Sequence, residues 1–402
     1  MWSRMRLDIG WRDLAAGLAY CGACPPQRPV WSELPHPAAP LLSVRTGWDL
    51  LLQSWRLPAG SEVLMSAFTI PDMAEIVRAN QLTPVPVDLK PGSYSPCTES
   101  LRRAVSPRSR VLLAAELFGE RYPLDELADF AERHNLALVA DLAQAYTGQL
   151  TLPAGAAAAL YSFGPIKTAT ALGGAVIVMR DAELAEQVIE REQRYPWARR
   201  SWFAARVCKH AALKAASTKP AYGAVVRWLQ RGGRDMDQSL SAAVKNFSAD
   251  ELLRAVRRRA PAPLLRLLDR KLRQDYRQRT NRRAAAAEEV VAAAGSRIWR
   301  RAESDHSFWL VPVVTLDPEE LVKRLRGEGF DAVQIRSLDV VPPPHSRDDV
   351  CVDNARAALF GTVFVPSYPD MPTSERRRLA DCLSGVQVLP VEETIASSAV
   401  AR

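Results

Sequence analysis

One lysine has a sequence context that suits covalent chemistry. Lys167 follows an apolar, strand-like run at residues 160–163 and a turn at Gly164-Pro165. A lysine that forms a Schiff base must sit on a rigid segment and lose part of its water, so that its amine is neutral often enough to attack a carbonyl carbon. The apolar run and the turn would meet both needs. Lys167 is therefore a candidate nucleophile, although solvated loop lysines occur in the same pattern.

A carboxylate follows a second strand-like run upstream. Residues 136–140 are apolar, Asp141 comes directly after them, and Gln144 comes three positions later. Chemistry in α/β proteins gathers at the carboxyl ends of parallel strands, and the pyridinium nitrogen of pyridoxal phosphate needs a carboxylate partner to stay protonated. Asp141 is thus a candidate cofactor anchor, with a helix N-cap as the alternative interpretation. Ser162 adds a hydroxyl that could bind a phosphate oxygen.

The elements that must position these residues alternate between strand-like and helical patterns. Short aliphatic runs predict strands at residues 61–65, 84–88, 110–115, 137–140 and 175–178. Helical periods between them predict helices at residues 72–80, 98–105 and 124–134. The fold class that follows is α/β, with a mostly parallel sheet covered by helices and the candidate residues at strand ends.

The second half of the chain predicts a linking helix and a smaller α+β domain. Residues 249–294 have a helical pattern with a break at 261–263, and their many arginines favour a solvated face. Further patterns predict strands at 307–314, 330–333 and 363–366 and helices at 318–328 and 371–383. His306 and Arg336 could face a substrate, although a lone histidine beside a strand is more often structural.

The N-terminal residues 1–40 resemble a signal peptide only superficially. A signal peptide begins with a positively charged region, but here Asp8 and Asp13 add acidic residues to it. The uncharged run that follows consists mostly of small residues. We therefore expect a cytoplasmic protein with an N-terminal helix or arm, in which the proline-rich residues 25–40 form a linker or arm over the surface. Cys21 and Cys24 form a Cys-x-x-Cys pair, but no second pair completes a zinc site. Reduced thiols are the simpler interpretation, and we predict no metal.

The chain has 402 residues and a net charge of +8, and its positive charge is concentrated in one segment. Between residues 191 and 234, Glu192 is the only acid among many arginines and lysines, and tryptophans are interleaved at roughly helical spacing. Such a segment suits a surface that contacts anionic lipid, and it equally suits a solvated, partly packed insertion. Nucleic-acid binding is disfavoured because no recognised module accompanies the charge.

These features divide the chain into four expected parts. They are an N-terminal arm (1–40), a large domain that binds pyridoxal phosphate (41–190), a basic, tryptophan-containing helical insertion (191–245), and a linking helix with the small C-terminal domain (246–402). The composition, 48% hydrophobic and 24% charged, is that of a globular protein long enough for two packed domains.

Several short runs resemble one enzyme family when they are taken in order. They lie at residues 46–51, 60–70, 86–88, 117–119, 141–145, 162–167 and 173–175. As a set they resemble the DegT/DnrJ/EryC1/StrS family of fold-type I pyridoxal-phosphate aminotransferases, which aminate keto sugars carried on nucleotides. The resemblance is clearest between residues 40 and 180 and becomes weaker up to about residue 385.

The resemblance implies a role for each matching residue. Lys167 would form the Schiff base with pyridoxal phosphate and move the proton, Asp141 would pair with the pyridinium, and Gln144 would lie beside the ring. Asn246 would reach across a homodimer interface to the neighbouring cofactor phosphate. Glutamate would be the amino donor and a nucleotide-linked keto sugar the acceptor. The remaining cofactor-binding positions implied in this way are Thr46, Gly47, Trp48, Ile70 and Ser162.

Departures from the family pattern leave other functions open. Trp48 stands where the family usually has a second hydroxyl, Ile70 where it has an aromatic that stacks on the cofactor, Glu116 where it often has histidine, and Ser248 where it has arginine. Trp48 could supply the missing stacking surface or be a core residue of a helix. The alternatives are a catalytically reduced relative that binds or regulates, a lyase of the same fold type, and a pyridoxal-phosphate enzyme with a membrane-associated substrate. A dehydratase that replaces the lysine by histidine is disfavoured by Lys167.

Overall fold

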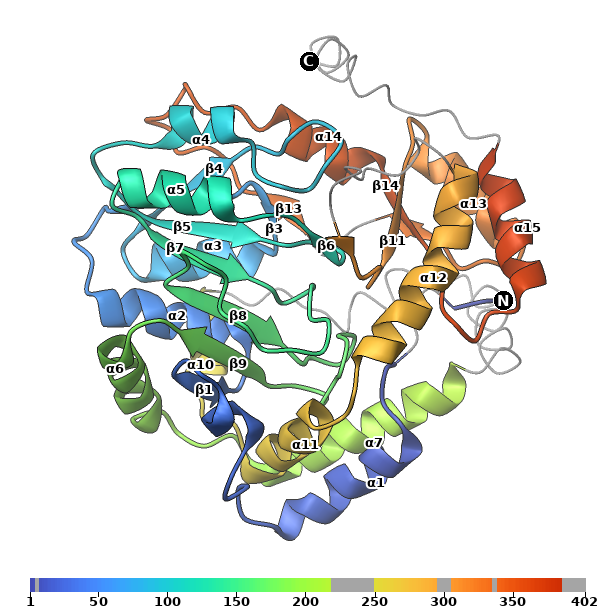
Figure 1. Cartoon of the computed structure of the whole chain (residues 1–402), viewed down its shortest axis with the longest axis horizontal. Helices are drawn as coiled ribbons and strands as arrows, with labels where there is room; N and C mark the ends of the chain where they lie inside the picture. Colours follow the sequence, from blue (N-terminus) through green and yellow to red (C-terminus); the bar gives the residue numbers. More distant parts are fainter. Residues whose placement is uncertain (4–6, 218–248, 295–304, 335–337, 385–402) are drawn as a thin grey trace.

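The computed structural model describes residues 1–3, 7–217, 249–294, 305–334 and 338–384. A seven-stranded sheet forms the centre of the molecule (Figure 1), with the strand order β1-β9-β8-β7-β5-β2-β4. The five strands from β8 to β4 are parallel, and β9 and β1 are antiparallel additions at one edge. The strands are β1 Ala38–Leu41, β2 Glu62–Ser66, β4 Thr83–Val87, β5 Ser109–Ala115, β7 Ala137–Asp141, β8 Ala158–Ser162 and β9 Ala175–Met179.

The predicted strands and the mostly parallel sheet are confirmed. Each predicted strand of the sheet agrees with the structure to within one residue at either end. The aliphatic runs form strands because both faces of the sheet are covered, so successive side chains are buried on opposite sides. On β2, for example, Val63 and Met65 belong to one core cluster and Leu64 to the other. The edge strand β1, which contains Pro40, was not predicted; proline is tolerated there because an edge strand needs fewer backbone donors.

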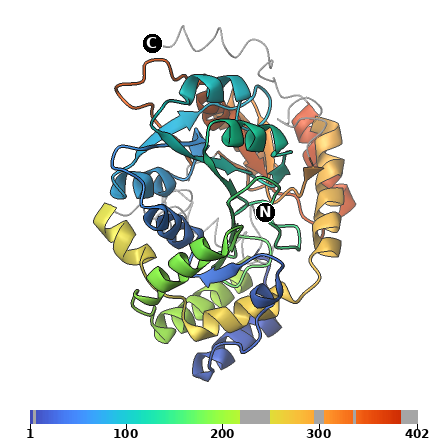
Figure 2. The same cartoon turned by 60° about the vertical axis from the view of Figure 1, so that its left-hand side comes forward.

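Two layers of helices cover the sheet (Figures 1 and 2). One core cluster joins the sheet to α4 (Thr98–Ala104), α5 (Asp125–Arg133), α7 (Arg200–Ala216), α11 (Ala262–Leu272) and α1 (Trp11–Ala19). The other joins it to α2 (Val44–Trp55), α3 (Pro71–Ala79), α6 (Ala182–Gln193) and α10 (Ala249–Val256). The predicted helices at 72–80, 98–105 and 124–134 correspond to α3, α4 and α5.

The C-terminal part is a smaller α+β unit, as predicted. Its sheet has the order β11-β14-β12, and α12, α13 and α15 pack around it on the right of Figure 1. The bounds are β11 Val311–Val314, β12 Val333–Gln334, β14 Thr362–Val365, α12 Arg277–Ala294, α13 Pro318–Gly327, α14 Asp353–Gly361 and α15 Thr373–Ser384. Two short strands join it to the large domain: β13 (Asp339–Val340) pairs with β3 (Phe68–Thr69), and β10 (Asp305–His306) pairs with β6 (Glu120–Arg121).

The prediction of one strand over residues 307–314 is wrong. The chain leaves β10 after His306 and turns through Ser307–Leu310, where Phe308 has a φ of 43°, before β11 begins at Val311. The predicted break in the helical region 249–294 is confirmed at Pro261, which precedes α11. A second interruption, between Leu272 and Arg277, separates α11 from α12 and was not predicted.

The N-terminal residues are packed more deeply than an arm over the surface would be. Leu14 of α1 and Trp31 are buried in the main core, and Gly17 lets α1 approach Val207 of α7 closely. Asp13 accepts a hydrogen bond from the buried Lys271 of α11 at 2.9 Å. Short 3₁₀ turns follow α1 at Tyr20–Gly22 and Val30–Glu33.

The chain start reaches the other unit. The backbone of Trp2 hydrogen-bonds to Gly329 and Asp331, and its indole donates to Glu375. The described residues up to Ala19 therefore contact both units of the chain. None of the helices in the described ranges is both long and apolar enough to cross a membrane.

Candidate active site

Lys167 lies in a tightly bonded loop between β8 and β9. The carbonyl oxygen of Phe163 accepts hydrogen bonds from the backbone of Ala171 (3.1 Å) and Gly173 (3.0 Å), which closes the loop on itself. Within it, Ala169 and Leu172 have φ angles of 57° and 64°, a region that non-glycine residues adopt only when their surroundings fix it. The loop thus provides the rigid segment that a nucleophilic lysine requires.

Support for this loop comes from distant parts of the chain. Asp8, near the N-terminus, accepts a hydrogen bond from the backbone of Ala169 at 3.3 Å and pairs with Arg279 of α12. On the other side, the guanidinium of Arg206 in α7 donates to the carbonyl oxygen of Leu172. Ala169 and Leu172, the two residues of the loop with positive φ angles, are therefore each held by a side chain from outside the loop.

The amine of Lys167 is set up to be neutral near physiological pH. Burial lowers its pKa to about 7; the carboxylate of Asp141 opposes that change and the charge of Arg45 adds to it. The amine makes no hydrogen bond or ion pair with any residue that the structure describes. A large fraction of it is thus deprotonated and able to attack a carbonyl carbon.

Asp141 ends β7, and its carboxylate lies near enough to the amine of Lys167 for the two charges to interact. Its Oδ1 accepts a hydrogen bond from the backbone of Ala143 at 3.0 Å, and its Oδ2 has no hydrogen-bond partner among the described residues. Burial raises the pKa of Asp141, while the Ala143 amide and the charge of Lys167 oppose this. No helix follows β7 in this part of the structure, so the N-cap interpretation is wrong. The open oxygen fits the protonated nitrogen of a pyridinium ring.

Trp309 covers the lysine from the C-terminal unit. Its ring centroid lies 4.0 Å from Nζ of Lys167, and its indole nitrogen donates to the carbonyl oxygen of Ile166 at 2.8 Å. Both contacts depend on the turn after β10, which the sequence analysis had assigned to a strand. Nothing in the sequence around Trp309 distinguishes it from the other tryptophans of the chain, so its role could not have been predicted.

Gln144 and Gly119 hold the segment that carries Trp309. The side-chain oxygen of Gln144 accepts the backbone N–H of Phe118 at 2.9 Å, and Phe118 has a φ of 59°. Gly119, with a φ of 98°, packs so closely that a Cβ there would lie 2.5 Å from Oγ of Ser307 and 2.8 Å from the backbone nitrogen of Trp309. Gln144 thus acts on the site through Phe118, and its predicted place beside a cofactor ring stays a prediction.

Arg283 is a second residue that the sequence analysis missed. From α12 it donates to the carbonyl oxygen of Ser307 (3.0 Å) and to Oγ1 of Thr168 (3.1 Å), directly beside the lysine. Its third nitrogen, Nη2, is buried without a hydrogen-bond partner in the described chain, as is Oγ of Ser307. Burial lowers the pKa of Arg283 to about 10, so it remains positively charged at neutral pH. A guanidinium with an unused donor of this kind pairs favourably with an anion such as a carboxylate.

The predicted phosphate loop forms the start of α2. Oγ1 of Thr46 donates to the carbonyl oxygen of Val256 at 2.8 Å, and a Cβ on Gly47 would lie 3.0 Å from the side chain of Leu41. Trp48 is fully buried, and its indole donates to the carbonyl oxygen of Met73 at 3.1 Å. The core interpretation of Trp48 is therefore the one that the structure supports. The roles of all three residues towards a phosphate stay predictions.

The remaining predicted residues lie in different places. Ser162 ends β8 half-buried, and its hydroxyl has no hydrogen-bond partner in the described chain. A Cβ on Gly164 would lie 3.7 Å from Oγ of Ser162 and 3.8 Å from Cγ of Lys167, so both side chains lie near the same face of Gly164. Ile70 is half-buried at the N-terminus of α3 and packs against both neighbouring cores. His306 is structural: its Nδ1 accepts the backbone N–H of Phe308 at 2.9 Å. Asn246 and Arg336 lie outside the described residues.

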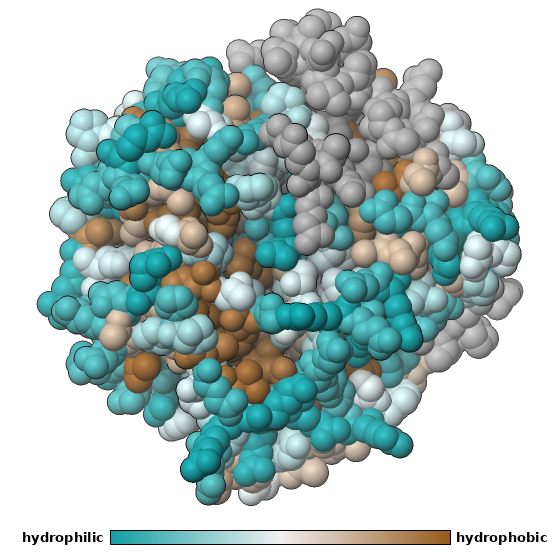
Figure 3. Space-filling view, in the orientation of Figure 1, coloured by the Kyte–Doolittle hydropathy of each residue, from teal (hydrophilic) through white to brown (hydrophobic). Residues whose placement is uncertain are grey.

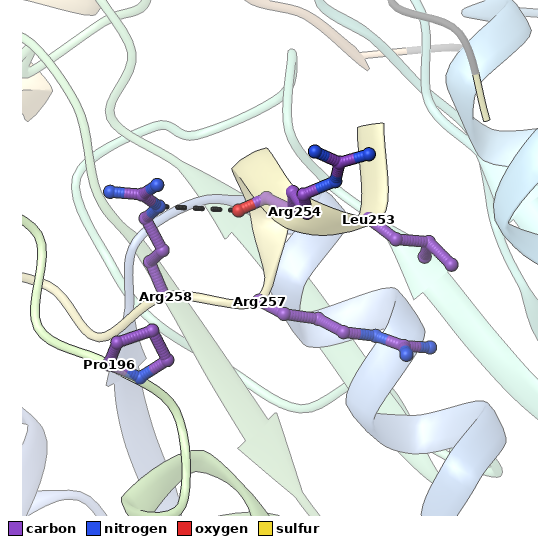
Figure 4. A pocket seen from close by; sticks show the side chains of 5 residues that line it. All are labelled: Pro196, Leu253, Arg254, Arg257 and Arg258. Atoms are coloured by element: carbon purple, nitrogen blue, oxygen red, sulfur yellow. Dashed lines mark hydrogen bonds between the residues drawn. The ribbon is translucent and has the colours of Figure 1, made fainter. Parts of the chain in front are cut away.

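A pocket of about 500 Å³ lies beside α10, and none of its lining residues was predicted to be in the site (Figure 4). Arg257 is held there by both oxygens of Asp49, and the Arg258 side chain donates to the carbonyl oxygen of Arg254. The pocket is separate from the lysine loop in sequence and in its contacts. Within the described ranges, no cluster of three or more histidine, cysteine or acidic residues could hold a metal.

The comparisons with known proteins agree with this geometry. Residues 41–200 match the model of the DegT/DnrJ/EryC1/StrS aminotransferase family. The dTDP-3-amino-3,4,6-trideoxy-alpha-D-glucose transaminase of Streptomyces venezuelae is 34% identical over 156 residues, which cover 37% of this chain and 41% of the relative. The pleiotropic regulatory protein of Geobacillus stearothermophilus is 32% identical over 143 residues, covering 34% and 38%. The match spans about two fifths of the length of these curated relatives.

The solved structures extend the likeness to nearly the whole chain at the level of the fold. The sugar aminotransferase CalS13 of Micromonospora echinospora superposes with a TM-score of 0.67 at 16% identity, over 96% of this chain and 99% of that one. The fold is thus that of a fold-type I transferase, as predicted. Residues 41–200, which carry Lys167 and Asp141, are thus the part of the chain that is similar to the DegT/DnrJ/EryC1/StrS aminotransferase family.

Proposed function

We propose that this chain is a pyridoxal-phosphate-dependent aminotransferase that moves an amino group from glutamate to a keto sugar carried on a nucleotide. The observation that carries the proposal is the amine of Lys167, whose pKa is lowered to about 7 beside the unpaired oxygen of Asp141. A structural lysine needs neither a lowered pKa nor a carboxylate with an open hydrogen-bonding position. The pair matches what a carbonyl cofactor with a basic ring nitrogen requires.

Each residue of the site has a separate role in such a reaction. Pyridoxal phosphate, when bound, supplies the electron sink that makes the amino-acid Cα–H acidic. Lys167 is the base whose amine takes up that proton and returns it, since it is neutral and mobile at the end of a flexible stem. Asp141 would hold the ring nitrogen by its Oδ2, and the hydroxyl of Ser162 would bind a phosphate oxygen. Trp309 and the packed loop exclude water from the amine.

Arg283 supports the choice of an amino acid as donor. Its buried, unpartnered Nη2 lies beside Thr168 in the lysine loop, where the carboxylate of an amino acid would supply the missing acceptor. The acceptor is a nucleotide-linked keto sugar by analogy with the relatives, among them the transaminase named above. From the resemblance to the family we further propose a homodimer in the cytoplasm, in which Asn246 would complete the neighbouring site.

The first experiment is a titration of the purified protein with pyridoxal phosphate, followed by its visible absorption spectrum. We expect a band that is absent from Lys167→Ala and present in Lys323→Ala, a matched variant of an exposed lysine on α13. Addition of glutamate should bleach the band and release 2-oxoglutarate. If glutamate leaves the band unchanged but another amino acid bleaches it, that amino acid is the donor, and the proposed reaction class still holds.

The second candidate function is a binding or regulatory protein that keeps the fold. It is favoured by Trp309, which covers the lysine, and by the name of the regulatory relative. Absence of any band that depends on Lys167 would favour it and contradict the aminotransferase. A band that forms without bleaching by any amino acid would instead favour a lyase of the same fold type.

A further inference from the structure

Helices α1 and α7 lie side by side in opposite directions on the outside of the molecule (Figures 1 and 2). At one end, the guanidinium of Arg200, which starts α7, donates to the carbonyl oxygen of Cys21, just after α1, at 3.0 Å. At the other end, Nζ of Lys214 lies 6.0 Å from the ring centroid of Trp11, the first residue of α1. The two helices thus present one continuous outer surface, called here the α1–α7 face.

Large apolar side chains stand exposed at both ends of this face. Trp11 is 55% and Leu213 44% exposed at one end, and Leu18 is 44% and Trp202 40% exposed at the other. Five alanines of the same two helices are exposed as well: Ala15, Ala19, Ala205, Ala212 and Ala215. Exposing four large apolar groups on two neighbouring helices has no role in packing, because the inner sides of α1 and α7 already fill the core through Leu14, Phe203 and Val207.

The charge of the face has a single sign. Arg12, Arg199, Arg200 and Lys209 are exposed on it, and α7 contains no acidic residue. The one acid of α1, Asp13, is buried and paired with Arg270 and Lys271, so it does not offset the surface charge. In the lower part of Figure 3, over α1, α7 and α11, hydrophilic residues are interspersed with paler and hydrophobic ones. Tryptophans among cations on a helical surface suit the boundary between lipid headgroups and acyl chains.

The geometry points to the α1–α7 face as a docking surface for an anionic lipid bilayer. A second copy of the chain is the weaker occupant, because a symmetric contact through this face would bring cations against cations. Nucleic acid is weaker too, since it offers no apolar layer for four exposed aliphatic and aromatic side chains. The face includes α1 from the N-terminal residues, so it differs from the basic segment that the sequence alone marked out. It goes beyond the proposed reaction and does not depend on it.

Docking would place the lysine loop close to the membrane. The inner side of α7 touches that loop through Arg206, which donates to the carbonyl oxygen of Leu172. A bilayer on the outer side of α7 would therefore lie one helix away from the site. This arrangement suits a substrate that is held at a lipid surface.

The test is co-sedimentation of the full chain with vesicles of phosphatidylcholine alone or of phosphatidylcholine mixed with phosphatidylglycerol. We expect the protein to sediment with the mixed vesicles and not with the neutral ones, and to be released as salt is raised. The double variant Trp11→Ala/Trp202→Ala and the single variant Lys209→Glu should each lose at least tenfold in the fraction bound. Phe360→Ala, which removes an aromatic side chain that is 60% exposed on α14, is the matched control and should bind like the unchanged protein.

Three results would overturn the docking surface. They are no sedimentation with the mixed vesicles, equal sedimentation with both kinds, and unchanged sedimentation of the double variant. Conversion of a dimer to a monomer by the double variant, without vesicle binding by the unchanged protein, would make the face a contact between copies. Circular dichroism and the Lys167-dependent absorption band show whether each variant is folded, so loss of lipid binding is separable from loss of the proposed reaction.

Discussion

The indole ring of Trp309 and the amine of Lys167 are stacked, with Nζ 4.0 Å from the ring centroid, although 141 positions separate the two residues in the chain. The contact brings the C-terminal unit over the candidate nucleophile. Trp309 affects the lysine in two opposing ways. Its bulk keeps water away, which lowers the lysine pKa, and its π face favours the charged amine, which raises it.

Trp309→Ala should raise the pKa of Lys167. Burial is the largest contribution to the lowered value of about 7, so admitting water outweighs the lost cation–π contact. The neutral fraction of the amine at pH 7 then falls, and the pyridoxal-phosphate band should form more slowly at that pH while recovering at higher pH. The measurement is the rate of band formation from pH 6 to 10. A midpoint that moves down would show that the π face dominates, and a midpoint that stays in place would show that the two effects cancel; either result contradicts the prediction.

Gly119→Ala should disturb this stacking without touching the lysine. The new Cβ would lie 2.8 Å from the backbone nitrogen of Trp309 in a residue whose φ is 98°, so the turn must shift. Backbone strain of this kind costs about 1–3 kcal/mol, and the close contact adds to it. Urea denaturation measures the loss of unfolding free energy.

Gly60→Ala is the matched control for that variant. Gly60 has a φ of 78°, and a Cβ there would meet nothing within 4 Å. The free energy of unfolding should therefore fall only by the cost of the backbone strain, about 1 kcal/mol. Equal losses in the two variants would mean that the contact with the Trp309 segment carries no free energy.

The sequence predicted the parts of the site that are local. Lys167, Asp141 and Ser162 lie at or near strand ends whose aliphatic runs are visible in the sequence. The strand that ends at Asp141 lies within one residue of its prediction, and β8, which ends at Ser162, begins two residues before the strand-like run at 160–163. Their surroundings depend on single contacts between distant segments. Asp8, Arg283 and Trp309 each hold the lysine loop from another part of the chain.

No pattern could select these partners. Arg283 is one arginine among many on a helical stretch, and its burial follows from how α12 leaves α11 at the unpredicted interruption after Leu272. The strand predicted over residues 307–314 failed for a related reason. Its composition is strand-like, but the close approach to Gly119 forces the turn at Phe308, and only the tertiary contact shows this.

Lys167→Met should stabilise the protein in the absence of cofactor, and by an amount that depends on pH. The pKa of Lys167 is lowered to about 7 in the folded chain from its ordinary value of 10.5. Below pH 7 the lysine is charged in both states and burial destabilises the fold in full. Between pH 7 and 10.5 only the unfolded chain binds the proton, so stability rises with pH and the penalty disappears.

The difference in melting temperature between Lys167→Met and the unchanged protein should therefore be largest below pH 7 and shrink towards pH 10. Taking the difference cancels the titration of all other groups. Lys323→Met, at a side chain that is 82% exposed, should show no such trend. A difference that is constant with pH would mean that the folded and unfolded chains share one lysine pKa.

Arg283→Met should weaken the binding of the amino donor and leave cofactor binding intact. The guanidinium has one buried nitrogen without a partner, and a donor carboxylate would gain a charge-assisted hydrogen bond from it. Losing such a bond costs about 1.5–3 kcal/mol, which corresponds to a rise in the donor KM of roughly 10- to 150-fold. The pyridoxal-phosphate band should form as before, because Lys167 and Asp141 are unchanged.

Arg282→Met, one position earlier and exposed on α12, is the matched control and should keep the original KM. If both variants kept it, the carboxylate would have to be bound elsewhere, and Arg283 would serve only to tie Thr168 to Ser307.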